Sequence, residues 1–149
     1  MSERLLEPGK RTAAIENQLG QRLRDHRGFE YMYVKAAEAV GANDVVTINQ
    51  VYAIHKLDTA ALTKFRRIGV ALDGAFAANQ HGWVCIYGVG QIKVKASCAA
   101  NAQLYTSATA GSMDDAATSH EGVKHIYLST ARGGTDGLAP AVWHYPDGS

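Results

Sequence analysis

Four side chains in the last third of the sequence belong to types that bind metal ions. His120 and His125 could supply imidazole nitrogen, and Asp114 and Asp115 carboxylate oxygen, to a divalent cation. Residues five apart on a strand point to opposite faces, so the two histidines converge only if the chain bends, as Gly122 would allow. The acidic pair is more simply explained as a turn, because Asp side chains satisfy local backbone groups there. We therefore expect no metal site.

Nucleophilic catalysis has two candidate pairs, Ser119 with His120 and Ser129 with His125. Neither serine lies in the glycine-flanked turn that exposes the nucleophile of many hydrolases. The sequence therefore gives no support for hydrolase chemistry at these serines.

The glycine and cysteine patterns complete no cofactor or redox motif. Gly88-Val89-Gly90 begins like a dinucleotide-binding fingerprint, but no third glycine follows and residues 92–96 favour a strand instead of a helix. These glycines more simply interrupt two strands and permit a bulge or a tight crossing. Cys85 and Cys98 lack C-x-x-C spacing, so we expect two buried free thiols. We predict no enzyme and no cofactor.

Positive charge gathers in two short clusters, each with aromatic neighbours on which a base could stack. The clusters and their neighbours are Arg22, Arg24, Arg27, Phe29 and Tyr31, and Lys64, Phe65, Arg66 and Arg67. The 149-residue chain has 15 Lys and Arg against 14 Asp and Glu, so its net charge of +1 provides no overall field for a nucleic acid or a membrane surface. We expect these arginines on a solvated face, with no nucleic-acid partner.

Short stretches of alternating polar and apolar residues, rich in β-branched and aromatic types, run through the chain. Predicted strands cover residues 29–35, 45–48, 51–54, 68–72, 83–87, 91–96, 104–106, 123–128 and 141–145. Short strands that recur every ~8–12 residues are typical of all-β domains. Residues 58–67 favour a helical turn or a loop, with Asp58 or Thr59 as N-cap. The predicted fold class is therefore all-β, a small antiparallel β-sandwich or barrel.

The first twenty residues differ in composition from the rest, and strand patterning starts only after them. Ile15, Leu19 and Leu23 recur at intervals of four, which could form an apolar helical stripe. We divide the chain into an N-terminal arm, residues 1–20, and a β-domain, residues 21–149. The arm either docks on a partner or is a frayed terminus. For a docking arm, its deletion should leave the melting temperature within about 4 °C.

The predicted strands carry more aromatic residues than a small single core easily encloses. The residues concerned are Tyr31, Tyr33, Trp83, Tyr87 and Trp143. Some must then face a partner, so we expect an oligomer interface at these positions, most simply in a homotrimer closed by rotation.

The sequence predicts neither a membrane span nor an export signal. Apolar runs stay far shorter than the ~20 residues of a spanning helix. The first residues carry acids and build no apolar segment of a signal peptide. We therefore expect synthesis in the cytosol and no membrane partner.

Residues 129–137, Ser-Thr-Ala-Arg-Gly-Gly-Thr-Asp-Gly, resemble the Arg-Gly-rich phosphate-covering tail of trimeric all-β dUTPases. The Gly-Arg-Ser-Ser phosphate motif of that family is absent, and a further strand, residues 141–145, follows the glycines. A glycine-rich turn between two strands explains them more simply. A hydrolase of dUTPase type is the enzymatic alternative.

A longer resemblance extends from Phe29 to Tyr145. Its segments are Tyr33-Val34-Lys35-Ala36, Ala42-Asn43-Asp44-Val45-Val46, Ile68-Gly69-Val70-Ala71, Gly82-Trp83-Val84-Cys85-Ile86-Tyr87-Gly88, Ala99-Ala100-Asn101-Ala102-Gln103-Leu104-Tyr105 and Ala108-Thr109-Ala110-Gly111. In this order they resemble bacteriophage capsid decoration, or cement, proteins.

This resemblance implies a structural virion protein on the outer surface of a phage head, made in the host cytoplasm. Such a protein bridges subunits of the major capsid protein, usually as a trimer that holds several subunits at once. We assign capsid binding to Leu5, Leu6, Ile15 and Leu19 of the arm, which would otherwise be exposed apolar surface. A β-rich head-fibre or receptor-contacting module is the second alternative.

Overall fold

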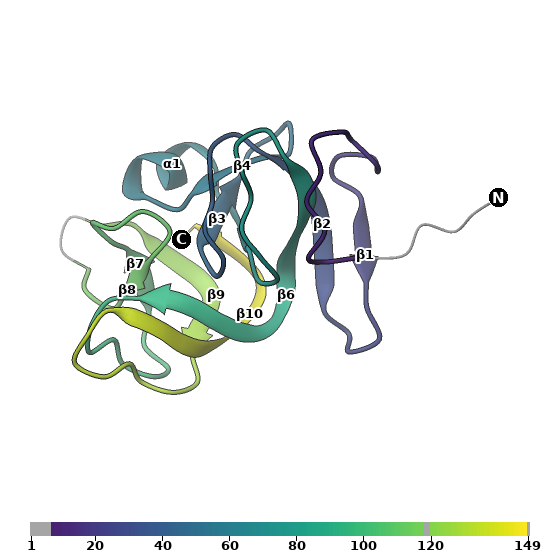
Figure 1. The fold of residues 1–149 in the computed structure, drawn as a ribbon. Coiled ribbons are helices and arrows are strands. Elements are labelled where there is room, and N and C mark those ends of the chain that lie inside the picture. Colours follow the sequence, from purple (N-terminus) through teal and green to yellow (C-terminus); the bar gives the residue numbers. More distant parts are fainter. Residues whose placement is uncertain (1–6, 118–119, 149) are drawn as a thin grey trace.

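The computed structural model describes residues 7–117 and 120–148, which form ten strands and one short helix (Figure 1). The strands are β1 (Arg22–Arg24), β2 (Glu30–Ala36), β3 (Val45–Ile48), β4 (Ala53–Lys56), β5 (Arg67–Val70), β6 (His81–Val94), β7 (Leu104–Thr106), β8 (Met113–Asp114), β9 (Gly122–Leu128) and β10 (Gly137–Gly148). The helix α1 (Thr59–Lys64) begins after Asp58, whose carboxylate accepts the Ala61 N–H at 2.6 Å. The predicted all-β fold is confirmed.

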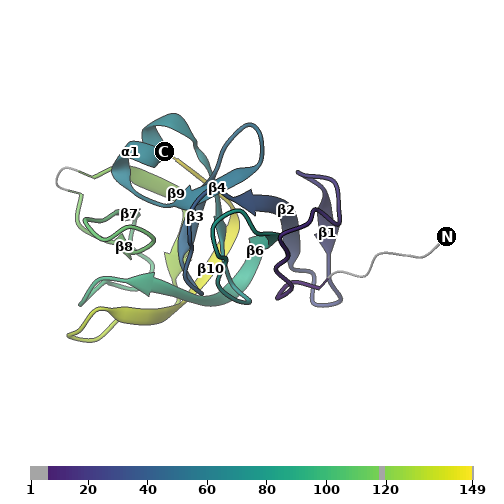
Figure 2. The ribbon, with the colours of Figure 1, turned by 45° about the horizontal axis from the view of Figure 1, so that its top comes forward.

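The strand pairings close into two rings that share the long strand β6. Ring 1 contains β2, β4, β3, β5 and the first half of β6, and β1 extends it beside β2. Ring 2 contains β10, the second half of β6, β8, β7 and β9 (Figures 1 and 2). Strand direction cannot alternate all the way around a ring of five. Each ring therefore has one parallel pair, β2–β4 and β6–β8, and the sheet is mixed where the sequence predicts an antiparallel one.

Strand β6 continues through Gly88-Val89-Gly90, where the sequence predicts an interruption. These residues lie where β6 leaves its pairing with β2 and runs on beside β10. A Cβ atom on Gly88 would lie 3.0 Å from Cys85 Sγ, and one on Gly90 would collide with Leu72 and lie 3.3 Å from Trp143. The missing side chains thus allow the close approach of Cys85, Leu72 and Trp143 without ending the strand.

Two apolar clusters fill the molecule. The first lies inside ring 1 and includes Met32 and Val34 of β2 and Val84 and Ile86 of β6. The second lies inside ring 2 and extends over the opposite faces of β2, β3, β5 and β6. Strands β2 and β6 are consequently buried on both faces in ring 1, which explains their nearly continuous apolar sequence.

This double burial corrects the assignment of aromatic residues to an oligomer interface. Tyr31, Tyr33, Trp83 and Trp143 are all buried in the second cluster, within a single chain. The prediction assumed one core with one buried face per strand. In the structure two apolar clusters lie on opposite faces of β2 and β6, and they enclose these four aromatic side chains. Tyr87 is half-buried and lies at the surface.

The described part of the N-terminal arm lies against strands β2 and β6 of ring 1. Thr12 and His81 exchange backbone hydrogen bonds of 3.0 and 2.6 Å. Further along, the Gly20 N–H donates to the Tyr33 carbonyl at 2.8 Å, next to the β1–β2 pairing. Residues 10–20 therefore belong structurally to the β-domain, and the boundary predicted at residue 20 does not separate a free arm from it.

The apolar residues of this arm do not form the predicted helical stripe. Residues 7–20 contain turns and one bridge in place of a helix. Leu19 and Leu23 pack against the second cluster, whereas Ile15 is exposed. Leu19 therefore stabilises the fold, which corrects its assignment to capsid binding. Leu5 and Leu6 lie outside the described residues.

Candidate functional site

The side chains considered for metal binding are only partly brought together. Cys98, Asp114 and Asp115 each present a ligand atom within 4.8 Å of the others, and His120 and His125 are not in this group. The Asp115 carboxylate accepts the Ala99 N–H at 2.9 Å, and the Asp114 carboxylate accepts the Asp115 N–H at 2.8 Å. Burial, followed by the two carboxylates, raises the pKa of Cys98 to about 11, so the thiol stays protonated near neutral pH. These acids therefore serve local backbone groups, as expected of a turn.

The candidate nucleophile Ser129 is engaged elsewhere. Its hydroxyl donates to the Pro140 carbonyl at 3.3 Å, across the β9–β10 pairing. His125 is exposed at a left-handed backbone position of β9, with φ of 65°. Ser119 lies outside the described residues. Within the described part of the chain, His125 therefore forms no hydrogen bond with Ser129.

Arg132 closes the glycine-rich turn between β9 and β10. Its guanidinium donates to the Thr135 carbonyl at 2.8 Å, to the Leu138 carbonyl at 2.8 Å and to the Thr135 hydroxyl at 3.1 Å. An arginine that covers a substrate phosphate needs these donors for the phosphate. The segment that resembles the dUTPase tail is thus a self-contained turn between two strands.

Both cysteines are buried and free, as predicted. Burial raises the pKa of Cys85 to about 12, and its thiol donates to the Tyr87 carbonyl at 3.3 Å. Protonated, enclosed thiols are poor nucleophiles and poor metal ligands. Cys85 therefore packs in the second apolar cluster, on the inner face of β6.

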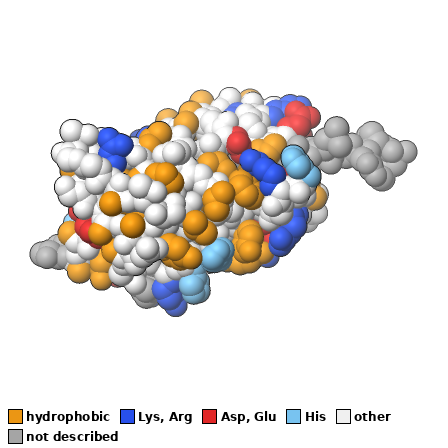
Figure 3. All heavy atoms as spheres, turned by 90° about the horizontal axis from the view of Figure 1, so that it is seen from below, with side chains coloured by type: hydrophobic (Ala, Val, Ile, Leu, Met, Phe, Trp, Pro, Cys, Tyr) orange, Lys and Arg blue, Asp and Glu red, His pale blue; other side chains and the backbone are white. Residues whose placement is uncertain are grey.

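Exposed apolar side chains concentrate on the outer side of β6, β9 and β10. We define the aromatic face as Tyr87, Val89, Tyr127, Leu138, Val142, His144 and Tyr145. Four of its members are between 36% and 49% exposed, and they are four of the six exposed large hydrophobic side chains among the described residues. Hydrophobic side chains gather over the arch of β6 and β10 when the molecule is seen from below (Figure 3).

Strand register explains why these side chains lie together. Val89 on β6 lies opposite Val142 on β10, and Val142 lies opposite Tyr127 on β9. Two residues further along these strands, Tyr87 lies opposite His144. Because alternate residues of a strand share a face, the three strands build one continuous surface.

A bulge in β10 adds the Tyr145 side chain to this surface. The β9–β10 register shifts between Trp143 and Asp147, and Tyr145 has a left-handed φ of 50°. His144 and Tyr145 therefore both reach the Tyr87 ring, each with a centroid distance of 5.3 Å. Bulges commonly redirect side chains in this way.

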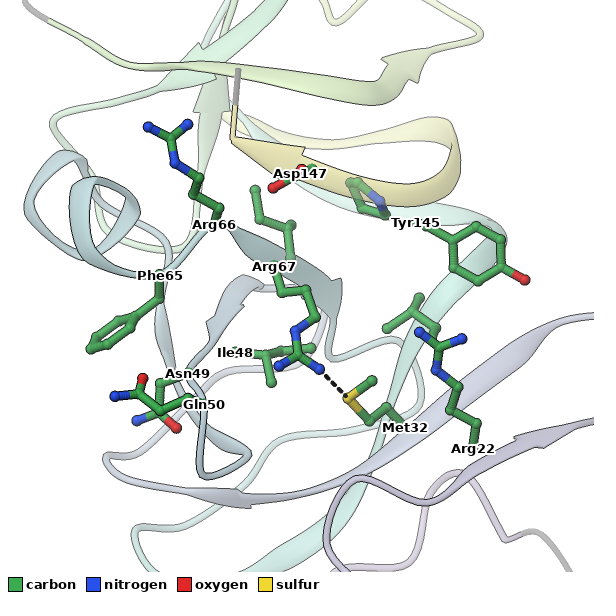
Figure 4. A pocket seen from close by; sticks show the side chains of 13 residues that line it. Arg22, Met32, Ile48, Asn49, Gln50, Phe65, Arg66, Arg67, Tyr145 and Asp147 are labelled. Carbon is green, nitrogen blue, oxygen red and sulfur yellow. Dashed lines mark hydrogen bonds between the residues drawn. The ribbon is translucent and has the colours of Figure 1, made fainter.

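A pocket of about 410 Å³ opens beside Tyr145, at one end of ring 1 (Figure 4). Its floor is apolar and is formed by Met32, Ile48, Ile68 and Ile86. Three arginines, Arg22, Arg66 and Arg67, line it together with the carboxylate of Asp147. The pocket thus combines an apolar floor with a positively charged rim.

Arg67 extends across this pocket toward Met32, whereas Arg66 points away from it (Figure 4). Arg67 Nη1 lies 3.9 Å from Met32 Sδ, and its guanidinium carbon lies 5.1 Å from the centre of the Tyr52 ring. In the described part of the chain, the partners of this guanidinium are a thioether and a ring, with no carboxylate among them. Its planar fork of N–H groups remains available to a ligand.

A network around Glu30 connects the pocket to the aromatic face. The buried Glu30 carboxylate accepts hydrogen bonds from Tyr145 at 2.8 Å and from Arg24 at 2.9 Å, and Arg22 lies 3.4 Å from it. The hydrogen bond to Glu30, followed by burial, raises the pKa of Tyr145, so its hydroxyl stays protonated and keeps donating. The network fixes Tyr145 between the two surfaces.

Sequence reasoning finds only part of these two surfaces. Tyr87 is named among the aromatic candidates, and Arg66 and Arg67 as a basic cluster. Val89 and Tyr145 are missed. A usable signal is the apolar type of both alternating sets in residues 138–144, which predicts a strand with apolar residues on its outer face as well.

No protein-family model matches this chain, and a search of curated proteins finds no significant match. Among the described residues, no helix is long and apolar enough to cross a membrane.

Proposed function

We propose that the protein is a structural virion protein that decorates the outside of a phage head by binding the major capsid protein through the aromatic face. The observation that carries the proposal is the exposed apolar surface on three paired strands, β6, β9 and β10. Contiguous exposed patches of this kind mark protein-binding sites. The sequence resemblance between Phe29 and Tyr145 supplies the class of partner.

The support beneath the aromatic face suits a binding surface. The inward side chains of the same strands include Ile126, Leu128, Ala141 and Trp143, all buried in the second cluster. Because paired strands with a packed underside are already ordered, binding costs little conformational entropy. The aromatic face therefore replaces the N-terminal arm as the proposed attachment site.

The proposal includes assembly as a homotrimer that bridges several capsid subunits. A trimer holds the capsid through three equivalent surfaces, so release requires all three contacts to open. The buried aromatic residues no longer support this number, and the resemblance to decoration proteins supports it.

The test is co-sedimentation with phage heads assembled from the major capsid protein that the same genome encodes. The variant Val89→Thr/Tyr127→Thr removes two apolar contacts and places threonine, which favours strands, at each position. We expect it to bind at least about tenfold more weakly, or ~1.4 kcal/mol. The matched control is Val51→Thr, an exposed valine outside the aromatic face, which should bind like the wild type.

Equal binding by the wild type and the double variant would remove the aromatic face from the proposal. Absence of binding to both expanded and unexpanded heads, together with binding to host cells, would favour the receptor-contacting alternative instead.

A further inference from the structure

The pocket beside the aromatic face holds surplus positive charge. Arg22 and Arg67 line it while the Arg66 guanidinium points away, and Asp147 is the carboxylate at its rim. The next carboxylate, Glu30, is already shared by Arg22, Arg24 and the Tyr145 hydroxyl. Among the described residues, the Arg67 guanidinium is therefore left without a carboxylate partner.

We propose that this pocket binds a peptide segment of a partner protein in which an apolar residue lies close in sequence to an aspartate or glutamate. The carboxylate lies on the Arg67 guanidinium, and the apolar side chain lies on the floor formed by Met32, Ile48 and Ile86. The volume of about 410 Å³ is toward the lower end of ligand pockets, which range from about 300 to 1,000 Å³. It suits two side chains better than a large cofactor.

Arg67 is the residue that selects for a carboxylate. Its guanidinium rests against the Met32 thioether and above the Tyr52 ring, which limits its motion without neutralising its charge. A guanidinium fork binds a carboxylate through two parallel hydrogen bonds, which a lysine cannot provide. The Arg67 guanidinium is therefore an oriented, positively charged binding group for a carboxylate.

Asp147 argues against a phosphate or a nucleic acid in the same place. A phosphate monoester carries a charge near about −2 at neutral pH, and Asp147 would repel it from the rim. A nucleic-acid backbone also needs cations along a path, whereas these arginines surround one pocket. A single carboxylate matches the charge better.

The apolar half of the ligand follows from the floor and from the neighbouring surface. Met32, Ile48 and Ile86 are almost fully buried, so a side chain entering the pocket gains contacts with an ordered surface. Tyr145 belongs to both the pocket lining and the aromatic face, so a partner covering that face can insert a segment here. The inference concerns peptide binding alone and can fail or hold independently of capsid attachment.

The test is an NMR titration of the isotope-labelled full chain with two short peptides. N-acetyl-Ala-Leu-Asp-Ala-amide should cause saturable shifts at Met32, Ile48 and Arg67, with a Kd on the order of 1 mM. N-acetyl-Ala-Leu-Asn-Ala-amide, which has the same shape without the charge, should bind at least about fivefold more weakly. The Arg67→Gln variant should weaken the first peptide about tenfold, and Arg67→Lys should restore only part of this loss.

Arg132→Gln is the matched control, because it removes an arginine whose donors are used in its own turn. It should leave peptide affinity unchanged. Equal affinity for the two peptides, no effect of Arg67→Gln in a folded variant, or identical shifts with acetate at the same concentration would each overturn the proposal. Unsaturated, scattered shifts with both peptides would overturn it as well.

Discussion

Gly111 holds the backbone next to an ion pair between the buried Asp44 and the partly exposed Lys93. Its φ is 84°, and a Cβ atom there would lie 2.6 Å from Asp44 Oδ1. The Asp44 carboxylate accepts the Lys93 ammonium at 2.7 Å and the Gly41 N–H at 2.6 Å, so a side chain at Gly111 would displace a buried, paired charge. Glycine at position 111 thus leaves room for the Asp44 carboxylate.

We therefore predict that Gly111→Ala lowers the free energy of unfolding by at least about 2 kcal/mol, from left-handed strain and loss of the ion pair geometry. Gly28→Ala has the same backbone sign with nothing within 4 Å, so it should cost only about 1 kcal/mol. Gly134→Ala meets neither obstacle and should stay within about 0.5 kcal/mol of the wild type. Urea denaturation measures all three. Equal losses for Gly111 and Gly28 would show that Asp44 yields without cost.

Cys85 makes stability fall at alkaline pH. Burial raises the pKa of its thiol to about 12, whereas an unfolded cysteine ionises near about 8.5. Below that value both states are protonated, so the thiol has no effect. Above it the unfolded state loses its proton first, and folding stability falls as pH rises.

We predict that between pH 9 and 11, under reducing conditions, the wild type loses up to about 1.4 kcal/mol per pH unit more than Cys85→Ala. The difference between the two proteins should be constant below about pH 8. Urea denaturation at a series of pH values measures it. Parallel curves across the alkaline range would mean that Cys85 ionises without cost in the folded state.

At the scale of elements, the sequence predicts short strands bounded by turns well and predicts strands poorly where the rings meet. Residues 45–48 and 123–128 match β3 and β9 closely. The single strand β6 is predicted as two, because Gly88 and Gly90 look like a break until Phe29 is placed against Gly88, and Leu72 and Trp143 against Gly90. Those contacts join distant parts of the chain, so no local pattern contains them.

The N-terminal segment gives the clearest prediction at this scale. Deleting residues 1–20 removes the Thr12–His81 hydrogen bonds, the Gly20–Tyr33 hydrogen bond and the packing of Leu19. We now expect the melting temperature to fall by more than about 4 °C, the opposite of what composition alone suggests. Ile15→Ser, at an exposed position of the same segment, is the control and should melt like the full chain. A truncated protein that melts within about 4 °C of the full chain would restore the dispensable arm.

At the scale of the whole molecule, ring closure decides which residues reach the surface. Trp143 and Tyr145 have similar sequence surroundings, yet the first is buried and the second is exposed after the bulge in β10. The Arg67 pocket likewise needs β2, β3, β5, β6 and β10 in place before it exists. The candidate site was therefore predictable only in its residue types, while its position depends on pairings between distant strands.

A cryo-electron microscopy reconstruction of expanded phage heads incubated with the protein tests capsid decoration through the aromatic face. We predict ordered density on the outer surface, in clusters of three, with the aromatic face of β6, β9 and β10 buried against the major capsid protein. Heads without added density at saturating protein, or density in which this face points to solvent, would contradict the account.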